Sequence, residues 1–281
     1  MYSIGIIGLG LIGGSLALAL NKYLSAVEIK GFDKNADNLD YALKNSMIDC
    51  KLTKDNIINL DIIFIAVPVK SIQTVLREYY SLLKVEKTLV TDMGSTKSYI
   101  HKKISSSFPN LKYIGGHPLA GKEVSGPRGA EADLFTGKKY ILIKQEQNND
   151  VNEVIILTDI LKKIGCNVIF MSPQEHDRFL AFSSHLPQVL STSLMVEYID
   201  FEKENREIAD LIGTGFLDMT RIAASDPHMW VDIFLTNKKN IINNIDKYIA
   251  VLNNFKQYIN NDDKEEIFNV MIKAGEKREE I

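Results

Sequence analysis

The chain has 281 residues, of which 45% are hydrophobic and 25% charged, and its formal net charge is −3. This composition is typical of a soluble globular protein with one large domain or two ordinary ones, and it argues against a nucleic-acid-binding surface. No apolar run reaches the ~20 residues that a membrane span needs, and no cationic segment begins a signal peptide. Cys50 and Cys166 lie far apart without metal-ligand spacing, so we expect a cytoplasmic protein without a bound metal or a structural disulfide.

The first 172 residues alternate between short apolar runs and amphipathic segments. The apolar runs predict strands at residues 2–7, 27–32, 61–68, 88–93, 113–118, 139–144 and 167–171. The segments between them predict helices at residues 13–24, 35–45, 71–83, 95–108 and 151–165. Because strands that alternate with helices form βαβ crossovers, we predict an α/β domain with a doubly wound, mostly parallel sheet over residues 1–172.

The pattern changes at residue 172. Ser172, Pro173 and Glu175 form a helix start, with the serine as N-cap and the proline at the first helical position. Asp226 and Pro227 form a second start of this kind. Beyond residue 172 the pattern predicts helices alone, at residues 174–200, 204–224, 228–258 and 263–278. We therefore predict an all-α domain over residues 173–281.

The glycine-rich stretch GLGLIG at residues 8–13 follows a predicted strand and opens a predicted helix. In a Rossmann-type fold Gly8 would make the tight turn, Gly10 would admit a pyrophosphate, and Gly13 would let helix and strand pack closely. Free N–H groups and the helix dipole favour an anion at this helix start. Asp33 ends the second predicted strand and can bind the ribose 2′-hydroxyl of NAD, while Lys34 leaves some tolerance of NADP. The sequence predicts an NAD-binding domain, with a glycine turn that binds nothing as the alternative.

Two polar side chains follow neighbouring predicted strands. Ser95 follows the strand at 88–93, and His117 lies at the end of the strand at 113–118. Because strand carboxyl ends line the ligand crevice of a doubly wound sheet, we expect both near the cofactor. A histidine with a hydroxyl partner can take a proton from a substrate hydroxyl while hydride leaves the same carbon. The alternative for His117 is a loop histidine that caps a backbone group.

The helical half contains two further candidate features. His185 lies two residues before a proline, where a buried histidine at a helix kink is the simpler interpretation. Asp218 and Arg221 are three residues apart, so on one helix face they could pair. An arginine held in this way is a bidentate clamp for a substrate carboxylate, and a plain surface ion pair is the alternative.

Six motifs occur in order along nearly the whole chain: GLGLIGGS, AVPV, DMGSTK, GGHPLAGKE, HLPQ and TRIAASDPHMW. Each is weakly specific, but together they are specific, and the chain resembles the prephenate dehydrogenases and their arogenate-using relatives of tyrosine biosynthesis. The resemblance implies a Rossmann-type NAD(P) domain followed by a helical domain that binds substrate and forms a homodimer. It also implies an oxidative decarboxylation in which prephenate and NAD give 4-hydroxyphenylpyruvate, CO2 and NADH.

The resemblance also implies roles for individual residues. His117 would accept the proton of the substrate 4-hydroxyl, Ser95 would be its partner at that hydroxyl, and Arg221 would bind a carboxylate. His185 would be a third catalytic residue, near substrate and nicotinamide. The other substrate-binding residues that it implies are Asp218, which would orient Arg221, and Glu123 and Trp230, which would line the pocket. The expected cofactor-binding residues are Gly8, Gly10, Leu11, Ile12, Gly13, Asp33, Val67 and Pro68.

Other functions remain open at this point. An arogenate dehydrogenase would form tyrosine itself, and the contacts that would distinguish it cannot be placed. A β-hydroxyacid dehydrogenase typically has a lysine in an NxxK pattern of its helical domain, whereas residues 237–240 read NKKN. A protein that only senses NAD would need none of Ser95, His117 and Arg221. We expect no fused chorismate mutase domain before Gly5 and no C-terminal regulatory βαββαβ module, so that tyrosine would act only at the active site.

Overall fold

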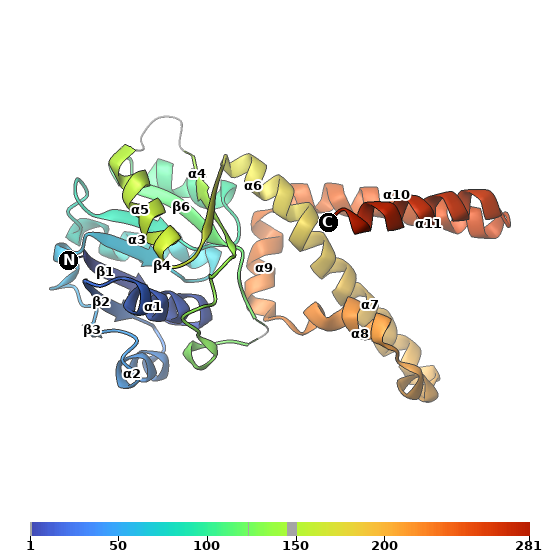
Figure 1. The fold of residues 1–281 in the computed structure, drawn as a ribbon, viewed down its shortest axis with the longest axis horizontal. Helices are drawn as coiled ribbons and strands as arrows, with labels where there is room; N and C mark the ends of the chain where they lie inside the picture. Colours follow the sequence, from blue (N-terminus) through green and yellow to red (C-terminus); the bar gives the residue numbers. More distant parts are fainter. Residues whose placement is uncertain (1, 123, 145–150) are drawn as a thin grey trace. The chain divides into compact units, whose positions relative to one another are not determined.

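The computed structural model of the chain describes residues 2–122, 124–144 and 151–281. The chain forms two compact units, Met1–Asn237 and Lys238–Ile281. The first unit contains an eight-stranded sheet and the helices that pack on it, and the second contains two helices (Figure 1).

The strands of the sheet are β1 (Tyr2–Ile7), β2 (Val27–Phe32), β3 (Cys50–Lys51), β4 (Ile62–Ile65), β5 (Leu89–Asp92), β6 (Tyr113–Pro118), β7 (Lys139–Ile143) and β8 (Asn167–Met171). Their order is β3-β2-β1-β4-β5-β6-β7-β8, and all neighbours are parallel except β6 and β7. The first six strands have the Rossmann order, so the predicted doubly wound, mostly parallel sheet is confirmed. The sequence pattern missed β3, because two residues show no periodicity.

Helices cover both faces of this sheet. Apolar side chains of α1 (Leu11–Tyr23), α2 (Ala36–Lys44) and α5 (Val151–Lys163) share one core with the sheet, and those of α3 (Ile72–Tyr79) and α4 (Ser98–Ser107) share the other. Ile62 and Phe64 of β4 belong to the first core, whereas Ile63 and Ile65 belong to the second. Because both faces are buried, the strands are continuous apolar runs without polar alternation.

Residues 172–281, all of which the structure describes, contain no strand, as predicted. The helices here are α6 (Pro173–Leu180), α7 (Leu186–Glu204), α8 (Thr214–Thr220), α9 (Pro227–Thr236), α10 (Lys238–Asn260) and α11 (Lys264–Glu279). Ser172 and Glu175 form the predicted capping box at the start of α6, and Asp226 caps α9. Both predicted helix starts are therefore confirmed.

Three of the long helices that the sequence predicts are interrupted. A π-helical turn at Ala181–His185 separates α6 from α7, next to Pro187, which has no N–H to donate to the preceding turn. The segment 204–224 contains only one short α-helix, α8, flanked by 3₁₀ turns at Arg206–Leu211 and Arg221–Ala224. The segment 228–258 divides at Asn237, which ends α9. Periodicity alone missed these interruptions.

The predicted domain division at residues 172/173 stays a prediction. Strands end there, but the first compact unit continues to Asn237 and includes α6 to α9. Leu180 of α6 packs against Ile141 and Ile143 of β7, which joins the helical segment to the sheet. This packing positions α6 over the end of the sheet that carries the candidate site.

The second unit consists of α10 and α11, joined by a turn in which Asp263 caps α11 by accepting the N–H of Glu266 at 3.1 Å. Its exposed large apolar residues are Ile242, Ile249, Val251, Leu252, Ile259, Phe268, Met271 and Ile272, with Ile281 at the end of the chain. So many exposed apolar side chains on two helices are typical of an interaction surface.

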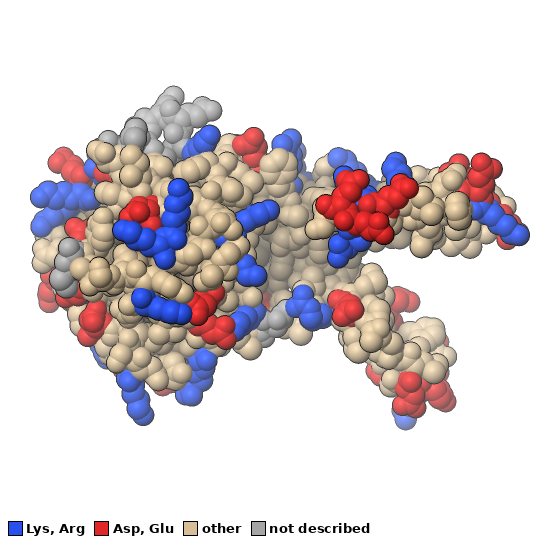
Figure 2. All heavy atoms as spheres, in the orientation of Figure 1, with Lys and Arg blue, Asp and Glu red and all other residues tan. Residues whose placement is uncertain are grey.

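Charges of both signs are interspersed over the visible face of the sheet-containing unit (Figure 2). This distribution fits the net charge of −3 and differs from the basic surface of a nucleic-acid-binding protein. In the described part of the chain, no helix combines the length and the apolar character needed to cross a bilayer.

Candidate active site

The glycine loop between β1 and α1 has the close approaches that its sequence predicts. Gly8 has a φ of +95°, and a Cβ atom at this position would lie 2.4 Å from the carbonyl oxygen of Ala66. A Cβ atom at Gly13 would lie 1.8 Å from the carbonyl oxygen of Gly8. At Gly10, by contrast, no described heavy atom lies within 4 Å of a Cβ atom built there. Gly8 and Gly13 are thus required by the fold itself, whereas Gly10 leaves the loop open on its outer side.

The start of α1 is suited to an anion. Gly10 is the N-cap, and among the described residues no side chain caps this helix and no acidic residue lies in its first turn. The N–H groups of the first turn and the positive end of the helix dipole therefore face the open side of the glycine loop. Leu11 and Ile12 begin the helix and are half-buried. Such a helix start fits the pyrophosphate of a dinucleotide.

Asp33 is held beside this loop. It follows β2, and its Oδ2 accepts the N–H of Leu9 at 2.7 Å while its Oδ1 accepts the N–H of Asn35 at 2.8 Å. Val67 lies on the other side, since a Cβ atom at Gly8 would be 2.9 Å from its Cγ1, and the exposed Pro68 follows it. The expected cofactor-binding residues thus surround one loop at the carboxyl ends of β1, β2 and β4.

Ser95 and His117 lie at neighbouring strand ends, as predicted. In the pairing of β5 with β6, Asp92 is opposite Gly115. Ser95 comes three residues after this pair and His117 two residues after it, and both are half-buried. The sheet therefore presents a hydroxyl and an imidazole from adjacent strands at the same edge as the glycine loop.

A buried ion pair supports these two strand ends. Lys97, which is 1% exposed, pairs with Asp92, which is fully buried, and also donates to the carbonyl oxygen of Gly116 at 2.6 Å. Asp92 accepts further hydrogen bonds from the hydroxyl of Tyr113 and, at 2.7 Å, from the N–H of Gly94. Because a buried charge is costly unless it is paired and hydrogen-bonded, this network fixes the end of β5 against β6.

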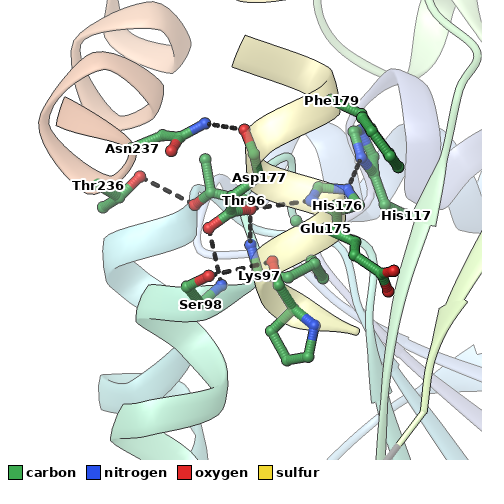
Figure 3. A network of polar contacts seen from close by, with 12 residues as sticks. Thr96, Lys97, Ser98, His117, Glu175, His176, Asp177, Phe179, Thr236 and Asn237 are labelled. Carbon is green, nitrogen blue, oxygen red and sulfur yellow. Dashed lines mark hydrogen bonds and ion pairs between the residues drawn. The ribbon is translucent and has the colours of Figure 1, made fainter. Parts of the chain in front are cut away.

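A chain of three side chains leads from His117 into α6 (Figure 3). His117 Nδ1 lies 2.8 Å from Nε2 of His176, and Nδ1 of His176 lies 2.8 Å from Oδ1 of Asp177. Asp177 also accepts the N–H groups of Lys97 at 2.7 Å and Ser98 at 2.9 Å. His176 and Asp177 are buried, so the imidazole of His117 is connected to a carboxylate inside the protein.

His185 belongs to the same region. It is buried in the π-helical turn, its ring packs edge-on against Trp230 at 5.9 Å between centroids, and its Nδ1 lies 3.2 Å from Nδ2 of Asn237. The amide of Asn237 also donates to the carbonyl oxygen of Asp177 at 2.7 Å. Asn237 therefore links His185 to the residues behind His117.

The predicted carboxylate clamp is arranged differently from the expectation. Helix α8 ends at Thr220, and Arg221 begins a 3₁₀ turn instead of continuing the helix with Asp218. Both side chains are exposed, and the contacts of the described residues include no ion pair between them. The α-helix thus ends one residue before Arg221, and the roles of Asp218 and Arg221 at the substrate stay predictions. Glu123 lies outside the described residues.

Three histidines of this region have lowered pKa values, which makes them neutral at pH 7. Burial lowers the pKa of His117 well below the usual 6.5, and the neighbouring His176, Lys97 and His185 lower it further. Burial also lowers the pKa of His176, and it lowers that of His185 to about 4. At neutral pH His117 is therefore an unprotonated imidazole that can accept a proton. Activity that depends on this base is expected to fall only well below pH 6.5.

The lowered pKa values of these histidines predict that the folded protein loses stability in acid. In the unfolded chain the histidines titrate near pH 6.5, so below that pH the unfolded state binds more protons than the folded state. The free energy of unfolding is therefore expected to decrease from about pH 6.5 downwards, for His185 alone on the order of 3 kcal/mol by pH 4. Urea unfolding at pH 7.5, 6 and 5 measures this, and His185→Gln should show a shallower decrease. A free energy that is constant from pH 7.5 to 5 would contradict the assignment.

Sequence reasoning missed His176, Asp177 and Asn237. His176 and Asp177 follow a recognised helix start, but adjacent residues on a helix show no spacing that indicates chemistry. In the sequence Asn237 belongs only to the stretch NKKN, which has no lysine at the fourth position of an NxxK pattern. In the structure it ends α9, and its side-chain amide donates to the carbonyl oxygen of Asp177. Asp92 and Lys97 are the first and last residues of the motif DMGSTK, but nothing in the sequence indicates that they form a buried ion pair.

Comparison with known proteins identifies the family. The family model described as "Prephenate dehydrogenase, nucleotide-binding domain" matches residues 16–170, and that described as "Prephenate dehydrogenase, dimerization domain" matches residues 172–273. The chain is 33% identical over 275 residues to the prephenate dehydrogenase of Bacillus subtilis, covering 97% of this chain and 74% of that protein.

Two solved structures extend the likeness to the whole fold. The prephenate dehydrogenase of Aquifex aeolicus in complex with hydroxyphenyl propionate and NAD+ has a TM-score of 0.92 and 30% identity, over 100% of this chain and 98% of that chain. The arogenate dehydrogenase of Synechocystis has a TM-score of 0.84 and 26% identity, over 99% of each chain. The glycine loop, the paired strand ends and these matches agree, and the chain belongs to the prephenate dehydrogenase family of NAD-dependent oxidoreductases.

Proposed function

We propose that this chain catalyses the oxidative decarboxylation of prephenate to 4-hydroxyphenylpyruvate and CO2 with NAD as the oxidant, and that His117 is the base. One observation supports this assignment above the others: His117 lies at the carboxyl end of β6, on the edge of the sheet that carries the glycine loop, where burial lowers the pKa of its imidazole well below 6.5. A neutral base at that edge is what the removal of a hydroxyl proton beside a dinucleotide requires.

The cofactor fits the residues present. Gly8, Gly10 and Gly13 with the start of α1 would hold the pyrophosphate, and Asp33 would bind the ribose of the adenosine half. Leu11, Ile12, Val67 and Pro68 would complete this cradle. When bound, NAD supplies a hydride acceptor for C4 of the substrate.

The protein's own groups would manage the proton and the charges. His117 would take the proton of the 4-hydroxyl, and Ser95, from the neighbouring strand end, would hold that hydroxyl by a hydrogen bond. Loss of the ring carboxylate as CO2 makes the ring aromatic, so the step is irreversible. His117 must be neutral to do this, and its lowered pKa ensures that it is neutral at physiological pH.

Prephenate is a dianion, so its binding needs a fixed cation in a chain whose net charge is −3. We assign this role to Arg221, whose planar guanidinium matches a carboxylate bidentately. Its 3₁₀ turn is anchored to α7, because the side chain of Gln188 donates to the carbonyl oxygen of Ile222 at 3.0 Å. His185 and Trp230 would line the pocket, and Asp218 and Glu123 would be further substrate-binding residues.

The product distinguishes this function from its alternative. With prephenate and NAD, we expect equal amounts of NADH, CO2 and 4-hydroxyphenylpyruvate, quantified by absorbance, carbonate trapping and chromatography. NADH without CO2 would contradict the decarboxylation. Arogenate is the second candidate substrate, because one structural relative is an arogenate dehydrogenase.

We further propose that the enzyme is a cytoplasmic homodimer. The helical segment matches a family model described as a dimerization domain, and α10 and α11 expose many apolar residues. Burying such a surface between two copies is favourable by the hydrophobic effect. The two free cysteines, Cys50 and Cys166, fit a reducing compartment. Sedimentation analysis tests the assembly, since a dimer has twice the chain mass of 31.7 kDa.

A further inference from the structure

We propose that His176 and Asp177 are positioning residues that fix the tautomer of His117, so that its Nε2 is the unprotonated nitrogen available to the substrate. This inference rests on the proposed role of His117 as the base. It assigns a function to two buried residues that the proposed mechanism has not used so far.

The position of the pair follows from the local structure. Ser172 and Glu175 fix the start of α6 by a capping box, which sets His176 and Asp177 in its first turn and a half. His176 contacts His117 of β6 on one side, and Asp177 contacts the start of α4 on the other (Figure 3). One short segment of α6 thus joins β6 and the start of α4, both of which lie more than 50 residues before it in the sequence.

Asp177 can only be a carboxylate acceptor in this arrangement. Its Oδ1 accepts the N–H of Lys97 and its Oδ2 the N–H of Ser98, at the N-terminus of α4, where the helix dipole favours a negative charge. Burial by itself would raise the pKa of Asp177, but the hydrogen bonds from His176, Lys97 and Ser98 outweigh it and the pKa is lowered. Asp177 is therefore ionised at neutral pH.

The direction of the two further hydrogen bonds follows from this charge. Because Asp177 has no proton to give, Nδ1 of His176 must donate to it at 2.8 Å. In a neutral imidazole the other nitrogen is then an acceptor, so Nε2 of His176 has a lone pair. His117 must accordingly donate from Nδ1 across the 2.8 Å contact, which leaves its own Nε2 unprotonated.

The direction of these hydrogen bonds determines which nitrogen of His117 faces the substrate. Free imidazole favours neither nitrogen strongly enough to guarantee the reactive form, and the wrong tautomer would present an N–H to the substrate hydroxyl. When His117 accepts a proton at Nε2, its Nδ1–H still donates to His176, and the Asp177 carboxylate lies behind both rings. The other titratable groups near His117 are Lys97, which is paired with Asp92, and His185, which is neutral at pH 7. The partner of His117 Nδ1 is Nε2 of His176.

The test is the tautomer of His117 in the full-length protein, read from its ¹⁵N chemical shifts and two-bond ¹H–¹⁵N couplings at pH 7.5, with NAD present. We expect Nδ1 to carry the proton and Nε2 to be unprotonated. In His176→Phe we expect a mixture with the Nε2-protonated form and a 10- to 100-fold lower kcat at unchanged KM for NAD. In His176→Gln the amide oxygen can accept the Nδ1–H of His117, so this variant should restore most of the wild-type tautomer and most of kcat.

His101→Phe is the matched control, because the imidazole of His101 takes no part in the hydrogen bonds that connect His117, His176 and Asp177, and it should change neither the tautomer nor kcat. An Nε2-protonated His117 in the wild type would overturn the inference, as would a His176→Phe variant with wild-type tautomer and kcat. If His176→Phe fails to fold, the wild-type spectrum still decides. A correct tautomer together with full turnover by His117→Asn would refute His117 as the base, so the two failures are distinguishable.

Discussion

Replacing His117 by asparagine is expected to lower kcat by roughly 10²- to 10⁴-fold, which is the usual contribution of a general base. Asparagine keeps an amide that can donate to His176, so the hydrogen bond behind the site survives, but it cannot accept a proton from a substrate hydroxyl. Initial rates of NADH formation with saturating prephenate measure the effect. Calorimetric titration should give a dissociation constant for NAD within about twofold of the wild type, which corresponds to less than about 0.5 kcal/mol of binding free energy. We expect no larger change because the variant leaves the glycine loop intact.

Ser95→Ala is the companion variant. It removes a hydrogen bond to the same hydroxyl without removing the base, so its loss of kcat should be smaller than that of His117→Asn. Turnover of His117→Asn at the wild-type rate would show that another group takes the proton. The unfolding transition of each variant is compared with the wild type, so that a loss of rate is not mistaken for a loss of fold.

The second large effect is expected from substitutions in the glycine loop. Two variants, Gly13→Ala and Gly10→Ala, distinguish a loss of folding stability from a loss of NAD binding. Gly13→Ala would place its Cβ atom 1.8 Å from the carbonyl oxygen of Gly8, so the first turn of α1 must shift. Overpacking of this kind costs about 1–3 kcal/mol or more, and we expect a lower free energy of unfolding together with loss of NAD binding. Urea unfolding and calorimetric titration with NAD measure the two effects.

Gly10→Ala is the matched variant. Gly10 has a φ of −72°, which alanine adopts readily, and no described heavy atom lies within 4 Å of the added methyl group. The free energy of unfolding should therefore stay within about 1 kcal/mol of the wild type, which covers the usual cost of alanine at an N-cap. Affinity for NAD should nevertheless fall at least tenfold, or about 1.4 kcal/mol, because the methyl group lies where the pyrophosphate approaches. Unchanged affinity would refute this loop as the cofactor site.

The features that the sequence predicts well are local. The glycine spacing, the acidic residue after β2 and the capping box at Ser172 each depend on a few consecutive residues, and the structure has the expected strand, turn or helix start at each. The parallel sheet was also predictable, because alternation of strands and helices leaves little choice of topology. The position of Ser95 and His117 at the ends of adjacent strands follows from that topology.

The features that the sequence did not predict depend on tertiary packing. Nothing in the spacing of His176 and Asp177 indicates that one faces β6 and the other the start of α4. Helix periodicity placed Asp218 and Arg221 on one face, but the helix ends between them at Thr220. Such interruptions bring polar groups to a site. Hydrophobic periodicity does not predict them, because it detects only regular helices and strands.

The most direct test of the account compares prephenate and arogenate, each with NAD and with NADP, by initial rates of NAD(P)H formation in the wild-type enzyme. We predict the highest kcat/KM with prephenate and NAD, since Asp33 would repel the 2′-phosphate of NADP. Turnover of arogenate alone would keep the roles of His117 and Ser95 and change the product to tyrosine. No turnover with either substrate, in protein shown to bind NAD, would contradict the assignment of His117, Ser95 and Arg221 as the catalytic site.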